Sequence, residues 1–236
     1  MPQIHKNRFL LAGWVLLALA GSSLARPDAY FDSTAVDLVQ FLPPVPGTDS
    51  TRKELVEMHH LQDARTPRQV AYAQADQKIS VFRFADVLDS AKFREDRLPV
   101  TAKFFSKVLA TGNGVSNVAK RKFDRPRPYA ADSTRRPCLD HPTNASYPSG
   151  HSLGGNLIAI VLADALADTS LKGRIYDRGW TFAKNRVLGG VHYPSDILAG
   201  RIAANLIAQR LYQEPEFRKD LEAVRAELKA EFGTKR

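Results

Sequence analysis

Three short clusters in the 236-residue chain place cationic, small and histidine side chains together, a combination suited to the chemistry of anions. The first, residues 120–128, reads Lys-Arg-Lys-Phe-Asp-Arg-Pro-Arg-Pro and contains Lys120 and Arg127. Lys and Arg also favour the last turn of a helix, and a proline stops a helix. Taken alone, this cluster is therefore better explained as a basic helix end.

The second cluster, residues 146–152, reads Ser-Tyr-Pro-Ser-Gly-His-Ser and directly precedes an apolar segment. Ser149 can start a helix, and Gly150 would let an anion approach the free backbone N–H groups of the first turn without a Cβ in the way. His151 would lie in the same turn, within reach of that anion. A capped helix whose histidine faces solvent explains these residues equally well.

The third cluster, residues 186–196, reads Arg-Val-Leu-Gly-Gly-Val-His-Tyr-Pro-Ser-Asp. Arg186 is expected at the end of one helix, and His192 and Asp196 across the start of the next. A carboxylate four residues on can accept a hydrogen bond from one imidazole nitrogen and leave the other as a nucleophile or base. A loop histidine with its hydrogen bonds satisfied is the alternative for this cluster alone.

The elements that must position these clusters are helices, because apolar residues recur at helical spacing and no comparable period-two run indicates a strand. The pattern predicts a mainly α fold, a single compact helical domain with the active site at helix ends. The helix starting at Ser195 is the best defined, with a serine cap and Asp196 in its first turn. The predicted helices are residues 50–62, 67–88, 99–122, 149–167, 172–188, 195–212 and 215–232.

The N-terminus resembles an export signal: Lys6 and Arg8 precede an apolar stretch at 9–20, and small residues occupy positions around 23–25. We expect a signal peptide at 1–25, cleavage after Ala25 and a periplasmic or secreted protein. A membrane anchor is the alternative, but the stretch falls short of the ~20 apolar residues a span needs. The domain would then be 26–236, with an irregular, proline-rich arm at 26–50 and an amphipathic helix at 215–232.

The net charge of the chain indicates which classes of partner it could bind. The chain has 34 Lys and Arg against 25 Asp and Glu, a net charge of +9, which suits a phosphorylated small molecule, a nucleic acid or a membrane surface. Cys138 is the only cysteine, so no intramolecular disulfide exists, and we assign it no role.

HExxH, CxxC and clustered carboxylates are missing, which fits a site with no metal and no cofactor. His59 and His60 are adjacent and would diverge on a helix.

Taken together, the clusters resemble the three-part signature of the phosphatidic acid phosphatase type 2 superfamily. The matching spacings are Lys120-x6-Arg127-Pro128, Pro148-Ser149-Gly150-His151 and Arg186-x5-His192-x3-Asp196. The exported, helical context, Tyr147 and the segments 42–44 and 215–217 are similar to bacterial class A non-specific acid phosphatases. Asn185 and Ser152 depart from the family's usual Ser and Thr, and we expect both to tune the site without abolishing it.

This resemblance implies metal-independent hydrolysis of phosphate monoesters through a phosphohistidine, with a broad substrate range and an acidic pH optimum. His192 would be the nucleophile, Asp196 would hold its other nitrogen, and His151 would protonate the leaving group and then activate water. The phosphoryl group would be bound by Lys120, Arg127, Ser149, Gly150 and Arg186. Small phosphomonoesters would be substrates and inorganic phosphate or vanadate inhibitors. We expect no nucleic acid partner and no membrane association after signal cleavage, while homo-oligomerisation stays open.

Three other functions compete with this one. A vanadate-dependent haloperoxidase has a similar signature, because vanadate occupies the same oxyanion site, but it is less expected in so short a chain. A basic helical nucleic-acid-binding module would explain the charge, but the chain has no basic stripe interleaved with aromatic residues. A membrane lipid phosphatase would need several transmembrane helices, which the sequence after residue 25 does not offer.

Overall fold

The computed structural model describes residues 28–166 and 168–233, and in these ranges the chain is helical with no β-strand. The expected mainly α, single-domain fold is confirmed. The predicted signal peptide at 1–25 lies outside the described residues. The α-helices are α1 (Leu38–Phe41), α2 (Thr48–Ala64), α3 (Pro67–Ala75), α4 (Pro99–Phe123), α5 (Pro128–Ala131), α6 (Gly150–Ala165), α7 (Lys172–Leu188), α8 (Pro194–Gln213) and α9 (Pro215–Phe232).

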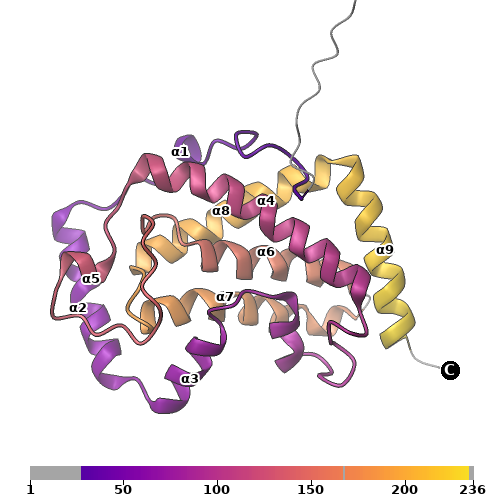
Figure 1. Ribbon diagram of the computed structural model, residues 1–236, viewed down its shortest axis with the longest axis horizontal. Helices are drawn as coiled ribbons and strands as arrows, with labels where there is room; N and C mark the ends of the chain where they lie inside the picture. The colour runs from indigo at the N-terminus through magenta and orange to yellow at the C-terminus, as the bar shows by residue number, and fades with distance from the viewer. Residues whose placement is uncertain (1–27, 167, 234–236) are drawn as a thin grey trace, which may run out of the picture.

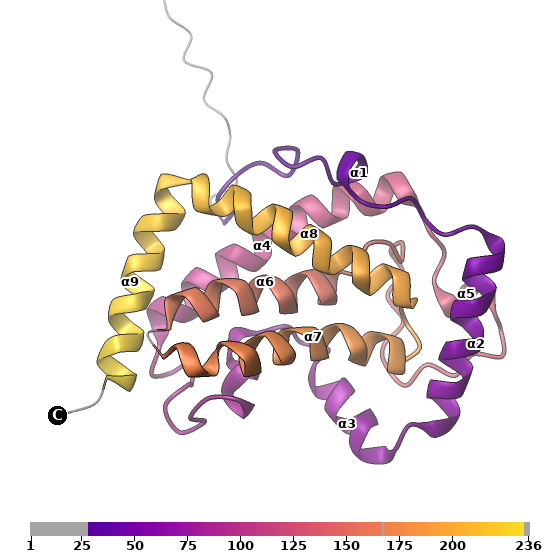
Figure 2. The same cartoon turned by 180° about the vertical axis from the view of Figure 1, so that it is seen from behind.

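Helix α6 is the centre of the molecule. It runs through the middle with α7 alongside, while α4 and α8 pass above it and α9 stands across one end (Figures 1 and 2). Twelve of its 16 residues are buried, among them Leu153, Leu157 and Val161, as expected for a core helix. In the two described ranges no helix has the length and apolar character needed to cross a bilayer.

The N-terminal arm and α9 close the core at its edges. Residues 28–47 run along the outside of α4, with Leu38 and Leu42 buried and α1 as their one helical turn. The Tyr147 hydroxyl donates to the Pro43 carbonyl at 2.6 Å, which ties the arm to the segment before α6. At the other edge, Phe217 of α9 is fully buried among aromatic rings.

The single helix expected over 67–88 is wrong. Helix α3 ends at Ala75, and after a break a 3₁₀ helix, η1, spans Val81–Asp86. At the break the buried Asp76 pairs with Arg178 of α7 at 2.7 Å, and the Ser80 hydroxyl accepts the Phe82 N–H at 3.2 Å as an N-cap. These contacts outweigh the local helical preference, because helix propensity is a weak prior that tertiary context overrides.

The start of α8 also differs from the expected Ser195 cap. Tyr193 is the N-cap, and its backbone N–H donates to the Asp196 carboxylate at 3.0 Å. Ser195 lies inside the helix, and its backbone N–H donates to Glu54 of α2 at 2.6 Å. The two shortest helices, α1 and α5, were not predicted, because four residues are too few to show a periodic pattern.

Phe217 gives a direct test of how α9 is held. Its ring centroid lies 5.3 Å from those of Tyr30 and Phe104 and 5.1 Å from that of Tyr212. Phe217→Ala would leave a cavity among these rings, so we expect the free energy of unfolding in urea to fall by about 3–5 kcal/mol. The control Phe41→Ala removes a ring that is 58% exposed and should change it by less than ~0.5 kcal/mol. Equal losses in the two variants would contradict this packing.

Candidate active site

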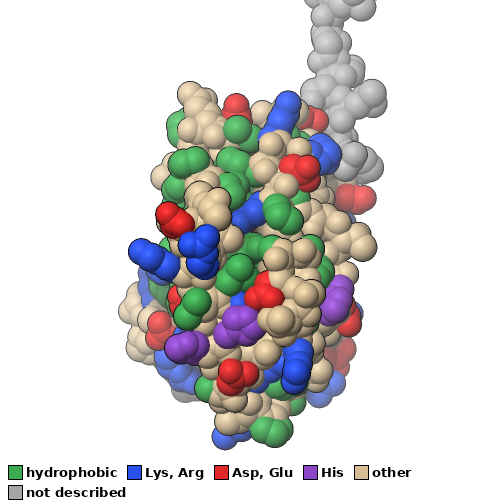
Figure 3. Space-filling model, turned by 90° about the vertical axis from the view of Figure 1, so that its left-hand side faces the viewer, with side chains coloured by type: hydrophobic (Ala, Val, Ile, Leu, Met, Phe, Trp, Pro, Cys, Tyr) green, Lys and Arg blue, Asp and Glu red, His purple; other side chains and the backbone are tan. Residues whose placement is uncertain are grey.

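All eight sequence-predicted site residues lie at one end of the helical bundle. Here α4 and α7 end and α6 and α8 begin, beside α2 and α5 (Figure 1). Figure 3 views this end, where basic, acidic and histidine side chains are interspersed. Lys120 lies in the last turn of α4, Arg186 in the last turn of α7, and Ser149, Gly150 and His151 at the start of α6. Arg127 follows α4, and His192 and Asp196 lie at the start of α8.

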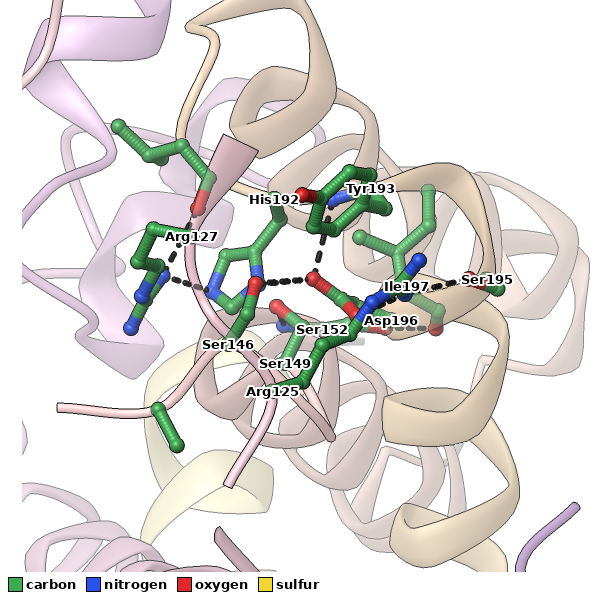
Figure 4. Close-up of polar contacts among 12 residues, drawn as sticks. Arg125, Arg127, Ser146, Ser149, Ser152, His192, Tyr193, Ser195, Asp196 and Ile197 are labelled. Atoms are coloured by element: carbon green, nitrogen blue, oxygen red, sulfur yellow. Dashed lines mark hydrogen bonds and ion pairs between the residues drawn. The ribbon is translucent and has the colours of Figure 1, made fainter. Parts of the chain in front are cut away.

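His192 and Asp196 form a buried pair (Figure 4). The Nδ1 of His192 lies 3.0 Å from Oδ2 of Asp196, while Nη1 of Arg127 lies 2.9 Å from Nε2 of His192. A carboxylate accepts and a guanidinium donates, so Nδ1 carries the hydrogen and Nε2 carries the lone pair. Burial, followed by the charge of Arg127, holds the pKa of His192 well below its usual value. The imidazole is therefore neutral near neutral pH, with a basic nitrogen directed at a cation.

Asp196 accepts hydrogen bonds at both oxygens. Its Oδ1 accepts from Nη1 of Arg125 at 2.7 Å, and its Oδ2 accepts from the Ser146 hydroxyl and the Tyr193 backbone N–H as well as from His192. A buried charge is tolerated only where it is paired and hydrogen-bonded, and this carboxylate is both. Its orientation is fixed from several sides.

Two glycines allow this end of the fold to close. Gly190 has a φ of +81°, a left-handed conformation that favours glycine, and it turns the chain between α7 and α8. At Gly200 in α8, a Cβ would lie 2.5 Å from the Ser149 carbonyl oxygen, so only glycine lets α8 approach the start of α6. There the Ser149 backbone N–H donates to the Asp196 carbonyl at 2.9 Å, which joins the two helix starts.

Three buried cations lie beside His192: Lys120, Arg127 and Arg186. Burial lowers the pKa of Lys120 to about 7, and the charges of Arg127 and Arg186 add to the effect. Burial and the charge of Arg127 also lower the pKa of Arg186 to about 10. Because the charges of neighbouring cations disfavour the protonated forms of Lys120 and Arg186, positive charge is in excess in this group of side chains.

Backbone carbonyls orient two of these cations, whereas the third lacks partners. Nζ of Lys120 donates to the Ala145 carbonyl at 2.7 Å, and Arg127 donates to the Asn144 carbonyl at 2.9 Å and its side-chain oxygen at 2.6 Å. Nε and Nη1 of Arg186 are buried with no hydrogen-bond partner in the described chain. Such orphaned donors are rare in proteins, and a ligand oxyanion would satisfy them.

The start of α6 adds further donors. Ser149 caps the helix by accepting the Ser152 N–H at 3.3 Å, which leaves its own hydroxyl hydrogen free to donate. A Cβ placed at Gly150 would meet no described atom within 4 Å, so space is open beside the N–H groups of the first turn. A helix N-terminus with accessible N–H groups favours an anion.

His151 faces the same group of cations from α6. Its Nε2 lies 2.9 Å from the Gln77 carbonyl oxygen, so Nε2 carries the hydrogen and Nδ1 is the free nitrogen. Burial and the charge of Arg186 lower the pKa of His151 to about 3. Like His192, it is neutral near neutral pH in the free protein.

Asn185 and Ser152, which differ from the residues usual in the family, form hydrogen bonds to residues beside the site. Asn185 donates to the buried Asp76 at 2.8 Å, and the Ser152 hydroxyl donates to the Ile197 carbonyl at 2.6 Å. Cys138 packs beside Leu139 and Val191. In the described ranges no group of three or more His, Cys, Asp or Glu side chains is arranged to hold a metal ion.

Sequence reasoning missed Arg125 and Glu54. Arg125 lies in the first cluster, which on sequence alone is better explained as a basic helix end, and only the fold shows that Arg125 reaches Asp196. Glu54 pairs with Arg125 at 2.8 Å, but it lies in α2, far from any motif. A local signal for Arg125 was therefore present, whereas Glu54 had none.

Comparisons with known proteins show which proteins this chain is similar to. The family model described as the PAP2 superfamily matches residues 102–220. A non-specific acid phosphatase of Salmonella typhimurium is 32% identical over 198 residues, which cover 80% of this chain and 78% of that protein. One from Salmonella typhi is 30% identical over 234 residues, covering 94% of this chain and 93% of that protein.

A solved structure shares the fold. It is a bacterial vanadium-dependent iodoperoxidase, 19% identical, with a TM-score of 0.58 over 75% of this chain and 53% of the other. At this level of identity the likeness concerns the arrangement of helices alone.

The buried Lys120 should make anion binding take up protons. At about pH 8 most Lys120 side chains are neutral, and a bound dianion raises the pKa toward the ordinary lysine value of ~10.4. We expect sulfate, which does not itself titrate here, to bind with uptake of up to about one proton and more weakly as the pH rises above about 7. Calorimetry in buffers of different ionisation enthalpy measures this uptake. The same uptake in Lys120→Met would assign it to another group.

Proposed function

The chain belongs to the PAP2 superfamily, and we propose that it acts as a metal-independent acid phosphatase that hydrolyses phosphate monoesters through a phosphohistidine. The observation that supports this most is the environment of His192. Its Nδ1 is paired with Asp196 and its Nε2 lone pair is directed at Arg127, in a group of cations that includes the unpartnered Arg186. A tetrahedral anion held by these cations would lie beside a nitrogen nucleophile.

In this proposal Lys120, Arg127 and Arg186 bind the phosphoryl oxygens, together with the first-turn N–H groups of α6 and the hydroxyl of Ser149. Arg127 exchanges its contact with His192 for one with a phosphoryl oxygen, which frees Nε2 for attack. The cations supply the charge neutralisation that other phosphatases obtain from metal ions.

The chemical step is then an in-line displacement, in which the nucleophile attacks phosphorus opposite the leaving oxygen. Nε2 of His192 forms a bond to phosphorus as the ester P–O bond breaks, and Asp196 stabilises the positive charge that develops on the imidazole. His151 gives a proton from Nδ1 to the leaving oxygen. It then takes a proton from water, which attacks phosphorus, breaks the N–P bond and releases phosphate.

The pKa directions favour an acidic optimum. His192 must be neutral to attack, and burial keeps its pKa well below the usual value, so it remains a nucleophile in mild acid. Lys120, with its pKa of about 7, keeps its charge below that pH. His151 must be protonated, and the negative charge of a bound phosphoryl group raises the pKa of an imidazole beside it.

We propose a broad range of small phosphomonoesters as substrates, because every substrate-binding residue in this proposal would contact the phosphoryl group, which all such esters share. The relatives named non-specific acid phosphatases support this range. Inorganic phosphate and vanadate would compete for the same cations, and vanadate more strongly because it forms adducts that resemble the transition state. The pattern at 1–25 supports export to the periplasm or the medium.

The role of the cations is tested with a chelator. We expect the purified protein to hydrolyse 4-nitrophenyl phosphate at an unchanged rate after dialysis against excess EDTA, because Lys120, Arg127 and Arg186 supply the positive charge. Loss of activity that a divalent metal restores would overturn the metal-independent mechanism. Peroxidase activity with vanadate, peroxide and halide in a protein without phosphatase activity would favour the haloperoxidase alternative.

Trapping the covalent intermediate separates the two histidines. We expect His192→Ala to abolish both turnover and the phosphoenzyme. His151→Ala should slow turnover by about 10²- to 10⁴-fold yet still accumulate phosphoenzyme from 4-nitrophenyl phosphate, whose leaving group needs little protonation. Rapid quenching with ³²P-labelled substrate measures both. Label retained in His192→Ala, or found on position 151 of the unmodified protein, would reverse the two roles.

A further inference from the structure

We propose that Arg125 is a positioning residue of the reaction, which fixes the Asp196 carboxylate and through it the orientation of His192. This inference rests on the proposed function, since it concerns the same nucleophile. Arg125 lies outside the predicted set of phosphate-binding residues, and it reaches the site from the turn after α4 (Figure 4).

The first support is the number of contacts that hold the guanidinium. Arg125 is only 4% exposed, and its Nη1 donates to Oδ1 of Asp196 and to the Ser195 hydroxyl, both at 2.7 Å. Its Nη2 donates to Oε2 of Glu54 at 2.8 Å and to the Thr51 hydroxyl at 3.2 Å. The guanidinium also lies over the ring of Tyr193, 3.7 Å from the centroid. The hydrogen bonds and the Tyr193 ring thus fix both the position of the guanidinium and the orientation of its plane.

The second support is the difference from the cations that face the proposed phosphoryl group. The two terminal nitrogens of Arg125 carry four N–H groups and contact four protein acceptors. Arg186, by contrast, has two buried nitrogens without a partner in the described chain. Arg125 is therefore committed to protein partners, while Arg186 retains donors for a ligand.

The third support is that the two oxygens of the Asp196 carboxylate have different hydrogen-bond donors. Arg125 holds Oδ1, so the plane of the carboxylate is set and Oδ2 is left for the three donors at the other side, among them His192. Without Arg125, the carboxylate would lose the one ion-pair partner of fixed charge that it has among the described residues, and it could rotate away from Nδ1. A displacement of about 1 Å in a catalytic group can cost ~10²-fold in rate.

Glu54 extends this arrangement into α2. One of its oxygens accepts from Arg125 and the other from the backbone N–H of Ser195, at 2.8 and 2.6 Å. Glu54 therefore balances the charge of Arg125 and holds the first turn of α8, which carries Asp196. Through Arg125 and Glu54, a helix with no motif residue contributes to the geometry of the nucleophile.

The test compares Arg125→Gln and Arg125→Lys with the unmodified protein, using 4-nitrophenyl phosphate as substrate and inorganic phosphate as inhibitor. We expect Arg125→Gln to lower kcat by about 10- to 100-fold. KM and the phosphate inhibition constant should stay within about threefold, because the phosphate-binding cations are unchanged. Arg125→Lys should recover part of kcat, since an ammonium keeps the charge but cannot bridge Asp196 and Glu54 in the same plane.

Arg225→Gln is the control. It breaks the ion pairs of Arg225 with Asp164 and Glu222 at the opposite end of the fold, and it should leave kcat unchanged. Far-UV circular dichroism checks folding. If Arg125→Gln does not fold, the double variant Glu54→Gln/Arg125→Gln removes the Glu54 charge that Arg125→Gln leaves without its partner, and this double variant takes its place in the test.

Two sets of outcomes separate this proposal from the proposed function. If the unmodified protein has no phosphatase activity or forms no phosphoenzyme on His192, the proposed function fails. If that protein is active but Arg125→Gln retains its kcat, or KM and the phosphate inhibition constant rise together with the loss in kcat, only the positioning role is overturned. Loss of folding in both the single and the double variant would likewise overturn it, since Arg125 would then serve the fold.

Discussion

The buried carboxylate of Asp196 is the group on which the rest of the site depends. It is fully buried, and a carboxylate in that position is stable only while charged and hydrogen-bonded partners surround it. Those partners come from separate parts of the chain: Arg125 after α4, Ser146 before α6, and the backbone of Tyr193 at the start of α8. Satisfying this one carboxylate therefore requires the ends of several helices to meet, and the meeting of those ends creates the site.

The same convergence concentrates positive charge. Lys120, Arg127 and Arg186 are buried together: the charges of Arg127 and Arg186 lower the pKa of Lys120, and the charge of Arg127 lowers the pKa of Arg186. The start of α6 adds the positive end of a helix dipole. Preorganised charge of this kind opposes folding locally but needs no rearrangement when an anion binds. The apolar packing of α6 against α4, α7 and α8 holds the helix ends in place against this repulsion. The core thus holds these cations close together, and an oxyanion that binds between them would neutralise their charge.

Much of this arrangement could be predicted from the sequence, because each motif lies where a helix starts or stops. Prolines at 99 and 215 and the glycines at 189 and 190 mark the bounds of α4, α9 and α7 closely, and the helix-end positions of Lys120 and Arg186 follow.

Contacts between distant parts of the chain could not be predicted in this way. Arg178, which accompanies the break after Asp76, lies 102 positions further along, and Glu54 precedes its partner Arg125 by 71. The periodicity of apolar residues within one helix does not indicate which residues pair across such distances in the sequence. The assignment of catalytic roles and the signal peptide at 1–25 stay predictions.

The most direct test of this account is the protonation state of His192, read by ¹⁵N NMR of histidine-labelled protein near neutral pH, with its signals identified by their loss in His192→Gln. We expect Nδ1 to carry the hydrogen, because it faces the Asp196 carboxylate, and Nε2 to carry the lone pair, because it faces Arg127. A hydrogen on Nε2 of a neutral ring, or a fully protonated imidazolium, would contradict the claim that Asp196 holds this histidine ready as a nucleophile.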